Sequence, residues 1–257
     1  KVTYIRAFFK EVVMRFFVFM MVLAIAVGCD SASQQPGKGQ TSPRSAVAQP
    51  KRTGPDRATD PIGALVDALN AEIKRDETGE IVEVSLGPSE SHDLEQLVGL
   101  TKLQKLDARS STVDDAELGH LAGLTELRSL NLTDTRISDA GLKHLGELAK
   151  LETLVLPTQI TDAGLSYIAS LTNLQTLRIS VLRATKKGNV TDNGLAHLAG
   201  MTKLHTLDLH RTQVTGSGIE HLKGLVELRT LTLNNTKFND AGMSHLTSLT
   251  GLETLSL

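Results

Sequence analysis

The chain contains few aromatic residues. Its 257 residues include no Trp, two Tyr and six Phe. Only Tyr167 and Phe238 lie beyond residue 60. Because strong protein interfaces usually have Trp, Tyr or Arg at their centres, the sequence identifies no aromatic hot spot for a partner.

Motifs for catalysis, metal binding and phosphate binding are also missing. Cys29 is the only cysteine, so there is no CxxC pair, and the chain has no HExxH motif, nucleophile elbow or phosphate-binding Gly-rich loop. Residues 1–60 hold 9 Lys and Arg against 4 Asp and Glu, and the remainder holds 18 against 25, with no basic stripe interleaved with aromatics. We therefore expect no enzyme activity, cofactor, small-molecule substrate or nucleic-acid partner.

The chain does contain a leucine-rich segment that recurs. Residues 124–145 read LTELRSLNLTDTRISDAGLKHL, and edited copies precede and follow them. Measured on one leucine per copy, the steps are 24, 24, 23, 30, 24 and 24 residues. The marker leucines are Leu106, Leu130, Leu154, Leu177, Leu207, Leu231 and Leu255. A fixed period of this size predicts a stacked array of repeats.

Each copy predicts a short strand followed by a helix. The LxL core alternates inward leucines with outward polar residues such as Ser129 and Asn131, which is the period of a strand. The second half has helical spacing and begins at a capping residue such as Ser138 or Thr161, usually followed by Asp. One copy buries too little apolar surface to offset the ordering of its backbone, so we expect the stacked array to be the smallest folding unit.

The LxxLxLxx pattern resembles the strand signature of the leucine-rich repeat family over residues 81–257. Better-known members have Asn or Cys after the strand, whereas hydroxyl residues stand here, as in the bacterial threonine-type variant with a DAGL helix. These residues are Ser111, Thr135, Thr158, Thr212 and Thr236. The resemblance implies an α/β repeat solenoid: a curved array with a parallel β-sheet on the concave face and helices on the convex face. It also implies binding of other molecules, usually proteins, on the strand face, and it implies no particular reaction.

The first 29 residues resemble a bacterial lipoprotein signal. Basic residues precede the apolar run of residues 16–28, which is short for a bilayer span but suits a signal peptide. Small residues before Cys29 resemble the processing site at which this cysteine is acylated. An ordinary cleaved signal and an uncleaved anchor are the alternatives, and Met14 is a candidate start of the natural protein.

Two segments separate this signal from the repeats. Residues 30–60 are rich in Ser, Pro, Gly and Gln and have no Leu, Ile or aromatic residue, which predicts a disordered tether. Asp60 and Pro61 then open an amphipathic segment, for which we expect a capping helix over residues 61–80, or else a partner-binding helix. The repeat domain follows over residues 81–257 with about eight strands. Its last strand stops without a helix, which favours a protein that continues beyond Leu257.

Candidate binding residues lie on the outward strand face and in one insertion. Most outward positions are small and hydroxylated, which suits good strand formation as well as a binding surface. The 30-residue step adds a loop, residues 180–189, that we expect to contact an acidic partner or an envelope polymer, with a solvated loop as the alternative. The partner-binding candidates are Asp107, Arg109, Arg178, Arg183, Lys186, Lys187, Asp208 and His210.

Five histidines recur at one repeat position. They are His120, His144, His197, His221 and His245. Neighbouring helices are about 8–10 Å apart, so equivalent rings would not converge on an ion that needs bonds of about 2 Å. We interpret them as packing residues that lean over the Gly three positions earlier, with a metal-binding or hydrolytic ladder as the alternative.

These features predict a membrane-tethered, non-catalytic scaffold of the bacterial cell envelope, anchored through Cys29 or the signal, or else secreted or periplasmic. A protein partner would bind on the concave strand face or at the 180–189 loop. The alternative is the repeat region of a longer enzyme or receptor whose active domain lies beyond Leu257.

Overall fold

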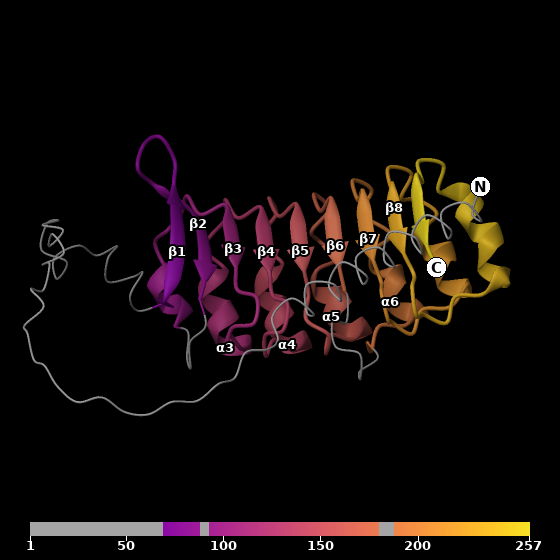
Figure 1. Cartoon of the computed structure of the whole chain (residues 1–257), viewed down its shortest axis with the longest axis horizontal. Helices are drawn as coiled ribbons and strands as arrows, with labels where there is room; N and C mark the ends of the chain where they lie inside the picture. The colour runs from indigo at the N-terminus through magenta and orange to yellow at the C-terminus, as the bar shows by residue number, and fades with distance from the viewer. Residues whose placement is uncertain (1–68, 88–92, 180–187) are drawn as a thin grey trace, which may run out of the picture. The chain divides into compact units, whose positions relative to one another are not determined.

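The computed structural model describes residues 69–87, 93–179 and 188–257. Those residues form an α/β repeat solenoid built on one nine-stranded sheet (Figure 1). Strands adjacent in the chain are adjacent in the sheet, and all pairs after the first are parallel. The strands are β1 (Ala71–Arg75), β2 (Ile81–Leu86), β3 (Lys105–Asp107), β4 (Ser129–Asn131), β5 (Thr153–Val155), β6 (Thr176–Arg178), β7 (Thr206–Asp208), β8 (Thr230–Thr232) and β9 (Thr254–Ser256).

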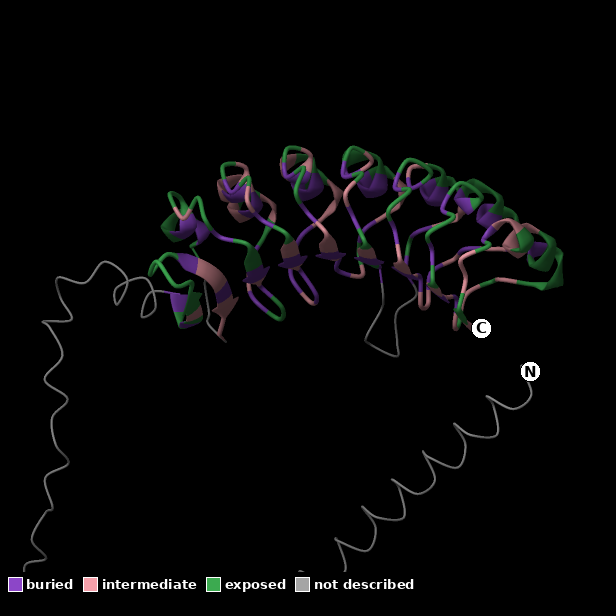
Figure 2. Ribbon diagram, turned by 90° about the horizontal axis from the view of Figure 1, so that it is seen from above, coloured by how far each residue is buried: buried purple, intermediate pink, exposed green. Residues whose placement is uncertain are grey.

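Short helical segments connect the parallel strands. The α-helices are α3 (Asp115–Leu118), α4 (Asp139–Leu142), α5 (Asp162–Tyr167) and α6 (Asp192–Ala196), and the 3₁₀ segments are η1 (Leu94–Leu97), η2 (Gly119–Leu121), η3 (Lys143–Leu145), η4 (Ser217–Leu222) and η5 (Asp240–Ser248). In Figure 2 the strands line the inner side of the arc and the helical segments its outer side. The predicted concave sheet and convex helices are therefore confirmed.

The register of the sheet is set by the marker leucines. Leu130 pairs with Leu154, and the irregular steps keep the same alignment, since Leu177 lies opposite both Leu154 and Leu207. A slip of one residue would turn each buried leucine toward solvent. The 23- and 30-residue steps are therefore accommodated in the turns, and the strands stay aligned.

The core is a continuous aliphatic layer between the sheet and the helical segments. Leucines such as Leu130, Leu154 and Leu207 are fully buried in it, and Phe238 packs against its edge. Tyr167, at the end of α5, is exposed on the helical side. The core therefore depends on repeated leucines and hardly at all on aromatic rings.

The start of the repeat domain differs from the expected helix over residues 61–80. Residues 61–68 lie outside the described residues, and from Ala71 the chain forms β1, which pairs antiparallel with β2. Ile73, which falls within the expected helix, lies opposite Val84 in this hairpin. The turn explains the difference: Asp76 accepts hydrogen bonds from the backbone N–H of Thr78 and Glu80, and Gly79 has φ of +90°. The Thr78 hydroxyl also donates to Asp76. This bond contributes most to lowering the pKa of Asp76, and the backbone bonds add to it.

The hydroxyl residues after the strands bond the turn backbone in three copies. Each Thr hydroxyl donates to the carbonyl three residues earlier, Thr135 to Leu132 (2.8 Å), Thr212 to Leu209 (2.8 Å) and Thr236 to Leu233 (2.7 Å). Thr158 makes no such bond among the described residues, and its copy is one residue shorter in this turn. The next residue, Gln159, donates through Nε2 to the carbonyls of Thr135 (2.9 Å) and Ile137 (2.6 Å) of the preceding repeat. The buried Ser111 hydroxyl has no partner among the described residues.

Candidate functional site

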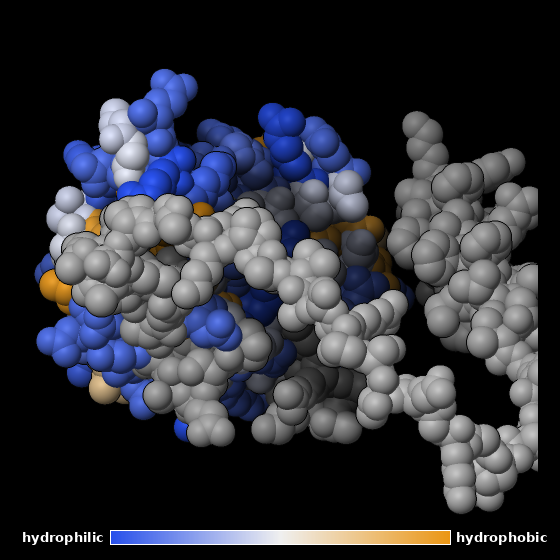
Figure 3. Space-filling view, turned by 60° about the vertical axis from the view of Figure 1, so that its left-hand side comes forward, coloured by the Kyte–Doolittle hydropathy of each residue, from blue (hydrophilic) through white to orange (hydrophobic). Residues whose placement is uncertain are grey.

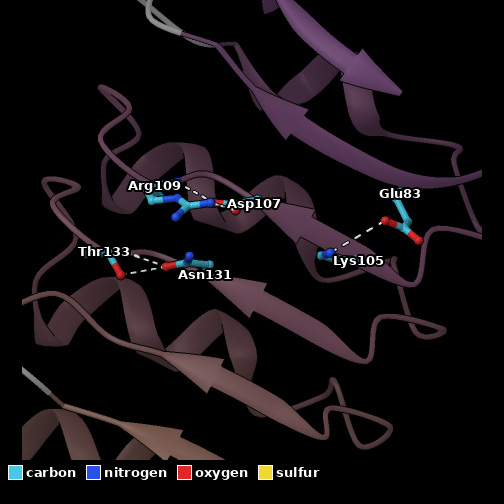
Figure 4. A network of polar contacts seen from close by, with 6 residues as sticks. All are labelled: Glu83, Lys105, Asp107, Arg109, Asn131 and Thr133. Atoms are coloured by element: carbon cyan, nitrogen blue, oxygen red, sulfur yellow. Dashed lines mark hydrogen bonds and ion pairs between the residues drawn. The ribbon is translucent and has the colours of Figure 1, made fainter. Parts of the chain in front are cut away.

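The amino-terminal part of the strand face carries charges that neutralise one another (Figure 4). Glu83 on β2 pairs with Lys74 on β1 (Nζ–Oε1, 2.7 Å) and with Lys105 on β3 (Nζ–Oε2, 3.6 Å). The hydrogen bond from Lys74, with the charges of both lysines, lowers the pKa of Glu83. Arg109 pairs with Asp107 at 2.6 Å. Both candidates at this end are therefore already partnered within their own repeat.

Acidic and amide residues at the strand ends also organise the turns that follow. Asp107 Oδ1 accepts the backbone N–H of Arg109 (3.1 Å), and Asp208 Oδ1 accepts that of His210 (3.0 Å). Asn131 makes the same bond to Thr133 and also accepts its hydroxyl proton (2.6 Å). Sequence reasoning treated Asp107 and Asp208 as free for a partner. Asp or Asn recurs at this repeat position, and both residue types commonly bond the backbone of the turn that follows. This recurrence could have indicated their role in the turn from the sequence.

The central part of the strand face is different. Arg178 on β6 is exposed and lies in register between Val155 on β5 and Asp208 on β7. It makes no ion pair with any residue in the part of the chain that the structure describes. The structure therefore brings Arg178, Asp208 and His210 together and separates them from Asp107 and Arg109 by β4 and β5. The candidates Arg183, Lys186 and Lys187 lie outside the described residues.

Of the five recurring histidines, His144 lies against a neighbouring repeat, whereas His221 is exposed. A Cβ at Gly119 would lie 3.6 Å from Cε1 of His144, so this ring contacts the preceding repeat. Among residues 69–87, 93–179 and 188–257, no group of three His, Cys, Asp or Glu residues could hold a metal ion. The three atoms nearest to a Cβ at Gly141 belong to Asp115, and the expectation that the ring leans over the Gly three residues earlier stays a prediction.

The Asp of each DAGL motif bonds the cap of the next repeat. Its carboxylate accepts both the backbone N–H and the hydroxyl proton of the Ser or Thr that begins the next helix. The pairs are Asp115 with Ser138, Asp139 with Thr161, Asp162 with Thr191 and Asp192 with Thr215, with N–H distances of 2.7–2.9 Å and hydroxyl distances of 2.5–2.6 Å. A Cβ at Gly141, Gly164, Gly194 or Gly218 would overlap the incoming carboxylate. From the sequence we expected this Asp to stabilise only the start of its own helix, whereas the structure shows that it also joins repeats.

The large exposed apolar side chains of the described residues do not mark a site. Figure 3 shows mostly hydrophilic side chains over the described part of this face, with small apolar areas between them. Large exposed apolar residues such as Val98, Val226 and Met243 occur singly, in different repeats. Isolated exposed apolar residues of this kind are normal for a soluble surface and indicate no particular partner.

Nothing in the described residues bears on the expected membrane attachment. None of the helices there has both the length and the apolar character needed to cross a bilayer. Cys29 and the apolar run of residues 16–28 lie outside the described residues.

Comparison with known proteins identifies the fold. No protein-family model and no curated protein matches the chain. Among solved structures, the chain is similar to an internalin (InlF) of Listeria monocytogenes, with a TM-score of 0.54 and 24% identity over 71% of this chain and 51% of that one. Internalin C2 of the same organism has a TM-score of 0.53 and 24% identity, over 76% of this chain and 90% of that one. This chain thus spans about half of the first structure and most of the second, and the similarity supports a leucine-rich repeat fold.

Proposed function

We propose that this chain is a non-catalytic scaffold of the bacterial cell envelope that binds a protein partner on its concave strand face. The observation that carries the proposal is the unbroken register of the parallel strands, which aligns small, half-exposed residues such as Thr153, Thr176, Thr206 and Thr230 in one row. An extended row of this kind offers a continuous contact surface, as is general for solenoids. The likeness to internalins supports the fold, and binding on the strand face is the use that the resemblance to threonine-type leucine-rich repeats implies.

A photo-crosslinking experiment tests the strand face. Benzoylphenylalanine is placed at Thr176 on β6 and, as a matched control, at Tyr167, an exposed aromatic on the helical side. After irradiation of intact cells, we expect a specific protein adduct from position 176 and none from position 167. An adduct only from position 167, or none from either in cells that carry the protein, would contradict the proposal.

We further propose that acylated Cys29 holds the scaffold at a membrane and that the 180–189 loop is a second contact. Mass spectrometry of the processed amino terminus should show a lipid-modified Cys29, and Cys29→Ser should release the protein from the membrane fraction. An unmodified terminus would indicate an ordinary cleaved signal.

Deleting residues 182–187, which removes Arg183, Lys186 and Lys187, should weaken partner capture at an unchanged Tm.

A further inference from the structure

Charged residues of alternating sign line the edge of the sheet at which the chain enters the strands. One repeat position there is occupied by Lys102, Glu126, Lys150, Asn173, Lys203 and Glu227. The charges pair across repeats: Lys150 Nζ lies 2.6 Å from Glu126, and Arg128 lies 2.5 Å from Glu152. The alternation therefore neutralises most of this edge.

The alternation fails in the repeat of β6. Asn173 stands where the pattern requires an acid, and Gln175 is the uncharged residue two positions later. Lys203 Nζ donates to Asn173 Oδ1 at 2.7 Å, but a neutral amide leaves the lysine charge uncompensated, and Lys203 has no ion pair within the described chain. The Gln175 side chain is exposed and makes no hydrogen bond to another described residue. Two cations, Lys150 and Lys203, thus flank two neutral amides.

A cavity of about 320 Å³ opens at this interruption. Its lining consists of Arg128, Lys150, Glu152, Asn173, Gln175 and Lys203. The lining holds three cations and one carboxylate; because Arg128 pairs with Glu152 and Lys150 pairs with Glu126, Lys203 supplies the excess positive charge, although the array as a whole is acidic. The amide of Gln175 adds a hydrogen-bond donor without a partner on the described protein. Such a lining favours a carboxylate ligand.

We propose that this cavity binds Asp or Glu side chains of an acidic segment in the protein partner. The inference rests on the proposed scaffold function and adds a contact at the sheet edge, separate from the strand face. The ammonium group of Lys203, which has no acidic partner within the described chain, attracts the carboxylate, and the Gln175 amide donates to it. The cavity has no aromatic ring on which a sugar could stack, which favours a peptide over an acidic polysaccharide.

Binding of a fluorescent hexaglutamate peptide at low ionic strength tests this assignment. Gln175→Glu keeps the shape of the side chain and cancels one positive charge, and its matched control is Gln104→Glu, the same change at the same repeat position outside the cavity. Lys203→Gln is paired in the same way with Lys102→Gln. We expect each cavity variant to weaken binding about two- to fivefold, each control to leave it unchanged, and added salt to weaken binding to the wild type. Thermal denaturation should show that all four variants are folded.

Equal weakening by cavity and control variants would overturn the inference, because the peptide would then respond only to net charge. Tighter binding of oligogalacturonate, with the same dependence on Gln175 and Lys203, would overturn it in favour of a polysaccharide. The crosslink from position 176 separates this result from the proposed function. If that crosslink forms but the cavity variants bind the peptide normally, only the cavity assignment fails.

Discussion

The junctions between most repeats differ from the junction that joins the last one. From Asp115 to Thr215, a carboxylate of each repeat accepts two hydrogen bonds from the cap of the next. At the last junction Gly216 replaces the Asp, and Asn239 begins η5 without a side-chain capping bond. The helical segments on both sides of the last junction, η4 and η5, are 3₁₀, whereas α3 to α6 are α-helical at their starts.

Backbone contact replaces the hydrogen bonds at the last junction. A Cβ at Gly141 or Gly218 would lie 3.1–3.2 Å from the Cα of the preceding Asp, but a Cβ at Gly242 would lie 2.5 Å from the Cα of Gly216. Without a carboxylate between them, the two segments approach more closely. We infer that the residue after the helix cap decides how neighbouring repeats are joined. An Asp there makes directional hydrogen bonds to the next cap, whereas Gly216 allows backbone contact alone.

The largest expected effect comes from the same leucine in the two regions. Leu154→Ala removes a fully buried side chain from the middle of the array and should lower the free energy of unfolding by about 2–5 kcal/mol. Leu255→Ala, at the equivalent position of β9, should have a smaller effect because Leu255 is only partly buried. Chemical denaturation of both variants measures the difference. Equal losses would show that the last repeat is as tightly packed as the others.

The next effect isolates the carboxylate bonds. Asp139→Ala leaves the N–H and hydroxyl of Thr161 without their acceptor and should lower stability by about 1.5–3 kcal/mol. Asp240→Ala is the matched control, since Asp240 also follows a helix cap but bonds no later repeat in the described chain. Amide exchange at Thr161 should quicken in the first variant and stay unchanged in the second. Similar stability losses in both would assign the Asp to its own helix, as the sequence suggested.

The sequence predicted those features that recur in every copy. Marker leucines such as Leu130 and Leu154 identified strand, register and core, because burial of one face imposes the same spacing on each repeat. The sequence could not show that Asp139 reaches Thr161, since the bond joins residues of different copies and a helix-capping role explained the Asp equally well. It also missed the hairpin of β1, because Ile73 fits a helical face until its pairing with Val84 is known. Contacts between units, which depend on how the units stack, were the part beyond prediction.

A smaller and more local effect is expected at Gly216. Its φ of −61° suits alanine, but a Cβ would lie 2.5 Å from the backbone N of Gly242 and 2.7 Å from its Cα. Gly216→Ala should therefore destabilise the last repeat by about 1–3 kcal/mol and speed amide exchange over residues 237–257. Exchange at Thr161 should not change. Gly123→Ala, where a Cβ meets open space, is the control and should be neutral or slightly stabilising, because alanine restricts the unfolded chain; an equal destabilisation there would show that contact with Gly242 is not the cause.

The smallest effect concerns the exposed ion pairs, which span repeats but are screened by water. Lys150 donates to Glu126 at 2.6 Å, and this bond lowers the pKa of Glu126 below its ordinary value. Because the folded pKa lies below the unfolded one, the pair contributes stability above the unfolded pKa and loses it as pH falls through the folded pKa. Lys150→Gln should raise the pKa of Glu126 in an NMR titration, whereas Lys237→Gln, in a distant repeat, should not. If the pKa of Glu126 stayed low in Lys150→Gln, the more distant charges of Lys102 and Arg128 would be the main cause of the low pKa. The charged residues of this edge would then act as a continuous row and not as separate pairs.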